Sequence, residues 1–95
     1  MALTADSIVQ VAAEVVSCDL DGETAILNTH TGDYFGLDEV GASVWRLIRQ
    51  PQTVAGIIEE ISAEYDVDPT RCQTDLLALV GQLAAHGLVV VSDRV

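Results

Sequence analysis

Apolar and polar residues follow two periods along the chain, first that of strands and then that of helices. From Ser7 to Leu20 the sequence is rich in valine and alternates in places, as at Val9-Gln10-Val11, which predicts one extended, partly twisted strand. Asp21-Gly22 predicts a tight hairpin turn, since glycine tolerates the positive φ that such turns need. Glu23 to Asn28 is then expected to form the returning strand, with apolar residues at its centre.

A second turn and a short strand complete this predicted sheet. Thr31-Gly32-Asp33 predicts the turn, and Tyr34-Phe35-Gly36-Leu37 predicts the third strand. Three strands that are joined by two short turns form an antiparallel meander.

Helical spacing of the apolar residues begins after Asp38, whose carboxylate can cap a helix. Gln50-Pro51 ends this first helix, and Thr53 is expected to cap a second helix that runs to about Tyr65. The first apolar face comprises Val40, Val44, Leu47 and Ile48, and the second comprises Val54, Ile57, Ile58 and Ile61.

Asp68-Pro69 predicts the start of a third helix, because an acid caps the N-terminus and proline suits the first helical position. His86-Gly87 ends that helix, and Leu88–Val91 predicts a short terminal strand. The predicted fold is α+β: a winged helix-turn-helix with an N-terminal three-stranded antiparallel β-meander and three helices. The apolar side of the third helix comprises Cys72, Leu76, Leu79, Val80 and Leu83.

Length and charge limit the classes of function. The 95 residues suit a single domain, residues 1–95, and leave little room for a deep enzyme cleft. Fifteen acidic residues against four arginines give a formal net charge of −11. Neither nucleic acid nor an anionic membrane is an expected partner, because both attract basic surfaces. The acidity favours solubility, or attraction to a basic peptide or partner enzyme.

Groups that could do chemistry are few and scattered. Cys18 and Cys72 are too few for a disulfide framework, and Cys72 lies on an apolar helical stripe, so reduced structural thiols are expected. His30 and His86 lie apart, without the spacing of metal ligands. We therefore expect no catalytic residue, no metal and no cofactor. The absence of a signal-peptide pattern and of a membrane-length apolar run predicts a cytoplasmic protein.

The strand Tyr34–Leu37 is short and aromatic, and it contains none of the lysine or proline residues that commonly protect an exposed edge. Its outer edge has no partner in the meander unless the terminal strand reaches it. One interpretation is an edge that the third helix covers, or that is too short to pair with another strand. The other is an open edge to which a peptide strand adds, with backbone hydrogen bonds setting its register.

The segment from Gly32 to Trp45 resembles the signature Gly-x-Tyr-Phe-x-Leu-Asn-x-x-Gly-x-x-Ile-Trp of PqqD-like proteins. Asp38 stands where many members have asparagine, and either residue can cap a helix. The resemblance covers roughly residues 14–90, and its weaker helical part includes Tyr65-Asp66-Val67-Asp68, Cys72, Asp75-Leu76, Leu83 and Gly87-Leu88.

This resemblance implies a non-catalytic protein that binds the leader of a ribosomally synthesised precursor peptide. In the family, the leader joins the sheet beside the third strand, here Tyr34, Phe35, Gly36 and Leu37, over a groove walled by the third helix. Cys72, Leu76 and Leu79 are the candidates for that wall, and Asp75 is a candidate for a hydrogen bond to the leader. The bound module then presents the precursor to a modifying enzyme.

The sequence leaves open which pathway the protein serves, and it also allows other classes of protein. The Asp-Gly-Glu turn and the Tyr-Asp-Val-Asp-Pro-x-Arg-Cys stretch are most similar to the lasso-peptide group, whose partners would be a transglutaminase-like leader protease and a cyclase. The alternative within the family is the pyrroloquinoline quinone type, which serves a radical SAM enzyme. A winged-helix DNA-binding regulator would need a basic third helix. The predicted third helix has one arginine, Arg71, and two acidic residues, Asp68 and Asp75. A structural subunit of a larger enzyme, and a dimer that exchanges strands through the open edge, are further alternatives.

Overall fold

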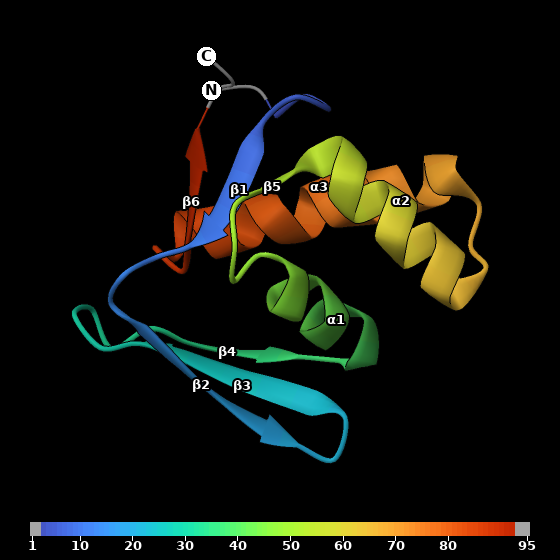
Figure 1. The fold of residues 1–95 in the computed structure, drawn as a ribbon. Coiled ribbons are helices and arrows are strands. Elements are labelled where there is room, and N and C mark those ends of the chain that lie inside the picture. The colour runs from blue at the N-terminus through green and yellow to red at the C-terminus, as the bar shows by residue number, and fades with distance from the viewer. Residues whose placement is uncertain (1–2, 93–95) are drawn as a thin grey trace.

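The computed structural model describes residues 3–92, which form six strands, three helices and two separate sheets (Figure 1). In chain order the elements are β1 (Ile8–Val11), β2 (Val15–Leu20), β3 (Glu23–Asn28), β4 (Tyr34–Leu37), α1 (Glu39–Leu47), β5 (Gln52–Thr53), α2 (Val54–Tyr65), α3 (Pro69–Ala85) and β6 (Val89–Ser92).

Both sheets are antiparallel and have three strands. The first has the order β5-β1-β6, and the second has the order β2-β3-β4, which is the meander that the sequence predicts. Figure 1 shows α1 above the β2-β3-β4 sheet, with α2 and α3 on the far side of α1. The α+β class, the three helices and the meander are therefore confirmed.

The expectation of one strand from Ser7 to Leu20 is wrong, because the chain passes from one sheet to the other within it. The backbone N–H of Ala12 donates to the carbonyl of Leu88 at 3.1 Å, beside the first sheet. The carbonyl of Glu14 accepts from Thr29 N–H at 2.7 Å, beside the second. Valines continue on both sides of this bend and neither glycine nor proline marks it, so the alternating pattern conceals the break.

The terminal strand β6 pairs with β1, with Val9 opposite Val91, and does not reach β4. The strand β5 was not predicted, since two residues are too few to show a period.

Local signals in the sequence fix the ends of the elements. The hairpin turn has Asp21 at φ 52° and Gly22 at φ 87°, the left-handed pair of a two-residue turn. The carboxylate of Asp38 accepts from Gly41 N–H at 2.8 Å and caps α1. Thr53 caps α2 and Asp68 caps α3 through their side-chain oxygens. All three predicted caps are thus confirmed.

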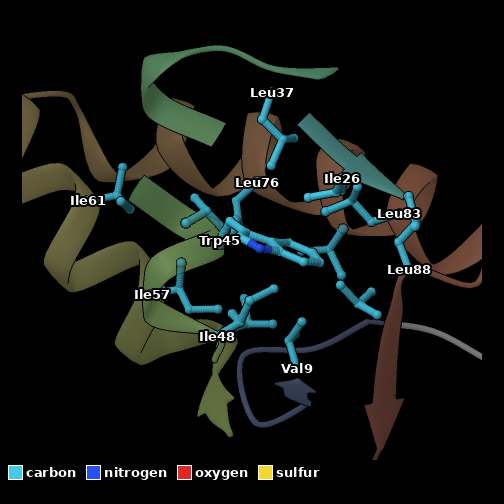
Figure 2. Close-up of a cluster of buried hydrophobic side chains, with 14 of the residues drawn as sticks. Val9, Ile26, Leu37, Trp45, Ile48, Ile57, Ile61, Leu76, Leu83 and Leu88 are labelled. Carbon is cyan, nitrogen blue, oxygen red and sulfur yellow. The ribbon is translucent and has the colours of Figure 1, made fainter. Parts of the chain in front are cut away.

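The core lies where the helices meet the two sheets, and Trp45 is at its centre (Figure 2). Its indole is only 2% exposed, and apolar residues from β1, β3, β4 and all three helices surround it. Burial of each such side chain stabilises the fold by roughly 1.5–3 kcal/mol. The labelled residues in Figure 2 are Val9, Ile26, Leu37, Trp45, Ile48, Ile57, Ile61, Leu76, Leu83 and Leu88.

Candidate functional site

An open cavity of ≈ 370 Å³ lies between the start of α1, the end of α2 and the first half of α3. We call it the α3 groove. Among residues 3–92, its lining is apolar except for a thiol and two carboxyl groups, and none of these lining residues is basic. The lining residues are Asp38, Val40, Val44, Ile61, Val67, Cys72, Asp75, Leu76 and Leu79.

One wall of the α3 groove contains the four α3 residues that the sequence singled out. Cys72, Asp75, Leu76 and Leu79 are spaced by three and four residues, so they share one face of the helix. Cys72 and Leu76 are almost fully buried and also belong to the core, whereas Leu79 is half-buried and Asp75 is exposed. Leu79 and Asp75 are therefore the α3 residues that a ligand would reach first.

The other walls come from residues that sequence reasoning did not assign to a site. They are Val40 and Val44 on α1, and Ile61 and Val67 from the end of α2 and its following loop. The sequence pattern indicates helical apolar faces for the first three and gives no structural role to Val67. For Asp38 the sequence predicts only a helix cap. No signal in the sequence separates these groove positions from core ones, although Val40 is 41% exposed in the structure.

The four predicted residues of β4 do not line the α3 groove; they lie beside it, and Asp38 directly after β4 joins the two. Phe35 and Leu37 point toward the helices, since Leu37 is in the core and Phe35 packs against it. Tyr34 and Gly36 alternate with them and face solvent on the other side of the sheet, where Tyr34 is 70% exposed.

The outer edge of β4 is unpaired among residues 3–92, because β4 ends the order β2-β3-β4. Asn28 N–H donates to the Asp33 carbonyl at 2.8 Å, which sets the alternation of the β3–β4 ladder. By that alternation, Phe35 and Leu37 form hydrogen-bonded pairs with β3, opposite Ile26 and Thr24. The N–H and C=O groups of Tyr34 and Gly36 then point to the open edge.

The strand β4 runs antiparallel to α3. Near the start of β4, the rings of Phe35 and His86 are 6.0 Å apart, and Asp33 Oδ2 is 3.9 Å from His86 Nδ1 at the end of α3. After the other end of β4, Asp38 lines the α3 groove with Cys72 and Leu76 from the first half of the helix. A strand added to β4 would therefore follow α3 along its length.

Two sets of polar contacts fix the elements around the candidate site. Asn28 is 5% exposed, and its Nδ2 donates to the carbonyl of Gly87 at 2.8 Å, which ties the β3–β4 hairpin to the end of α3. On the other side, the buried Ser43 hydroxyl of α1 lies 2.6 Å from the Tyr65 hydroxyl and 3.2 Å from a Glu64 oxygen, both on α2. Neither set of contacts is evident from the sequence.

The chemistry of the groove suits binding more than catalysis. Burial, and next the nearby Asp75 carboxylate, raise the pKa of the Cys72 thiol above its ordinary value. The thiol is therefore protonated at neutral pH and a weak nucleophile. Within residues 3–92, no three His, Cys, Asp or Glu side chains are grouped so that they could hold a metal ion. In the same part of the chain, no helix has the length and apolar character needed to cross a bilayer.

Solved structures with similar folds include two leader-peptide complexes. TbiB1 in complex with the TbiA(beta) leader peptide is 36% identical, with 84% of this chain and 93% of that chain covered and a TM-score of 0.78. Lasso peptide synthetase B1 complexed with the leader peptide is 22% identical, with 86% and 96% covered and a TM-score of 0.75.

A third similar structure is the PqqD truncation of PqqCD from Methylobacterium extorquens, described as a functional, stand-alone recognition element for ribosomally synthesised and post-translationally modified peptides. It is 21% identical, with 94% of this chain and 95% of that chain covered and a TM-score of 0.78. No curated protein sequence matches the chain significantly. The family model for coenzyme PQQ synthesis protein D (PqqD) matches residues 23–89, from β3 to the start of β6. The chain therefore belongs to the PqqD family.

Proposed function

We propose that this chain is a single-domain recognition module that binds the leader of a ribosomally synthesised precursor peptide and does not itself catalyse a reaction. The observation that carries this proposal is the unpaired edge of β4 beside the α3 groove. The leader adds to β4 as a strand, bonding to the outward backbone groups of Tyr34 and Gly36, and places apolar side chains in the groove. The similarity to TbiB1, whose structure contains a leader peptide, supports this mode of binding.

The precursor bound in this way is presented to separate enzymes. The two similar lasso structures favour a lasso-peptide pathway, in which a transglutaminase-like leader protease and a cyclase act on the presented peptide. The alternative, supported by the family match and by the similarity to the PqqD truncation, is delivery to a radical SAM enzyme of a pyrroloquinoline quinone type pathway.

Leader binding is tested by fluorescence polarisation with two fluorescein-labelled probes: the TbiA(beta) leader, and the leader of any precursor gene that sequencing finds next to the gene for this chain. The wild-type protein is expected to bind at least one of them. Val40→Asn and Leu79→Asn, on opposite walls of the α3 groove, should each weaken binding roughly tenfold or more, because an amide replaces an apolar contact.

Asparagine is chosen because it adds no charge. The matched control is Thr74→Asn, an exposed position on the side of α3 away from the groove lining, which should bind as the wild type does. Circular dichroism and thermal melting establish that each variant is folded; Val40 at 41% exposure is the safer of the two positions. Failure of the wild type to bind either leader would show the proposed function to be wrong. Normal binding by a folded Val40→Asn would remove the groove from the site.

A further inference from the structure

We propose that the α3 groove selects a peptide segment carrying a lysine or arginine two residues from its apolar anchor, with Asp38 and Asp75 as the residues that recognise the positive charge. This inference rests on the proposed function and adds the chemistry of the ligand. Its basis is the composition of the groove, whose lining is apolar apart from the Cys72 thiol and these two carboxyl groups on different walls.

Neither carboxylate has a cationic partner within the described part of the chain. Among residues 3–92, the only contact within 4.0 Å between a histidine or arginine nitrogen and a carboxylate oxygen is that of His86 with Asp33, at the end of β4 away from the groove. Asp38 uses Oδ1 to cap α1, which leaves Oδ2 for another group. Asp75 forms no side-chain hydrogen bond in residues 3–92. Arg71, one turn earlier on α3, lies outside the groove lining and beyond ion-pair distance of Asp75.

Electrostatics make a neutral or acidic peptide a poor occupant. An apolar side chain that fills the groove removes water from around Asp38 and Asp75, and a carboxylate that loses water without gaining a partner is destabilised. The Asp75 charge already acts on the buried part of the α3 wall, since it contributes to the raised pKa of the Cys72 thiol. A peptide ammonium or guanidinium group compensates both carboxylates, whereas a glutamate is repelled by both.

The geometry of strand addition sets where the basic residue stands. In a strand, residues i and i+2 point to the same side and are about 6.6 Å apart. The apolar anchor and the basic residue are therefore separated by one residue that points away from the groove. The net charge of −11 also attracts such a peptide over longer distances and makes its association dependent on salt.

A charge-exchange experiment tests this selectivity. The probes are variants of the labelled leader that the wild type binds. Each variant carries lysine, glutamine or glutamate at one position, and every position is substituted in turn. At one position, two residues from an apolar anchor, the wild type should prefer lysine to glutamate about tenfold at low salt. Asp75→Lys should abolish or reverse that preference, and the double variant Asp38→Asn/Asp75→Asn should reduce it. Asparagine at position 38 preserves the cap of α1.

The matched control is Glu59→Lys, which changes the net charge equally but lies exposed on α2, on the side opposite the groove residue Ile61. It should keep the preference for lysine. The inference is overturned if lysine, glutamine and glutamate bind equally at every position, or if Asp75→Lys and Glu59→Lys have the same preference. Either result would leave the proposed function intact, because leader binding itself is measured with the unmodified peptide.

Discussion

Asn28 is the residue that connects most parts of the candidate site. Its Nδ2 donates to Gly87, and its Oδ1 accepts from the backbone N–H groups of His30 and Thr31 at 2.9 and 3.1 Å. One side chain thus shapes the turn between β3 and β4 and attaches it to the end of α3. The position of the β3–β4 turn relative to the end of α3 depends on these three bonds.

Asn28→Ala should lower the free energy of unfolding by roughly 2–3 kcal/mol, because it removes a buried residue with three hydrogen bonds. Leader affinity should fall as well, since the hairpin is no longer fixed to α3. Urea denaturation and fluorescence polarisation measure the two effects. His30→Ala, at an exposed neighbour with no side-chain hydrogen bond in residues 3–92, is the control. A change in stability of less than about 0.5 kcal/mol for Asn28→Ala would contradict the assigned role.

Residues whose role is local were predictable from the sequence, and residues with distant partners were not. Asp38, Thr53 and Asp68 bind backbone groups within three residues, so each cap is visible in a short window of sequence. Asn28 binds Gly87, 59 residues away, and no local pattern distinguishes it from an ordinary residue at a strand end. For the same reason, Val40 and Val67 could not be assigned to the groove.

At the scale of elements, the strand β4 has two kinds of backbone N–H group. Those of Phe35 and Leu37 belong to the ladder with β3, and those of Tyr34 and Gly36 face outward. Proline removes the backbone N–H donor of the residue that it replaces. At Phe35 or Leu37 the lost donor is one that the fold uses, and at Tyr34 or Gly36 it is one that only a ligand would use.

Gly36→Pro is expected to leave the protein folded and to weaken leader binding, whereas Phe35→Pro should destabilise the sheet itself. Gly36→Ala is the control: nothing lies within 4 Å of the added Cβ, and the N–H is retained. It should bind normally and be more stable by about 0.5–1 kcal/mol.

A companion experiment leaves the protein unchanged. N-methylation of the leader backbone, one residue at a time, should weaken polarisation binding at alternate positions only. Binding that is indifferent both to Gly36→Pro and to every N-methyl group would show that the leader does not add to β4.

The meander and all three helices were predictable because their turns and caps are encoded locally. The break between β1 and β2 was not, because both segments are valine-rich and no glycine or proline separates them. The pairing of β2 with β3 follows from the hairpin turn, whereas β1 pairs with β6, which lies at the other end of the chain. The partner of the terminal strand was equally hidden: β6 follows the helices directly, yet it pairs with β1 rather than with β4.

At the scale of the whole molecule, the net charge of −11 distinguishes this protein from DNA-binding proteins, which present basic surfaces to phosphate. On α3, Arg71 is accompanied by Asp75 and follows the capping Asp68, so the helix offers no basic surface to phosphate. We expect no shift of a 20-base-pair duplex in an electrophoretic assay at micromolar protein and low salt. Binding that appears at low salt and weakens steeply as salt is added would contradict this.

The pairing of β1 with β6 brings the start and the end of the described chain together, with Ile8 opposite Ser92. That pair belongs to a different sheet from β4, and Figure 1 shows it on the side of the molecule away from the β2-β3-β4 sheet. A linker joined near Ile8 or near Ser92 would therefore leave the candidate site unobstructed. A short flexible tether to an enzyme would hold the captured precursor at a millimolar effective concentration, so that even weak capture would supply successive reactions.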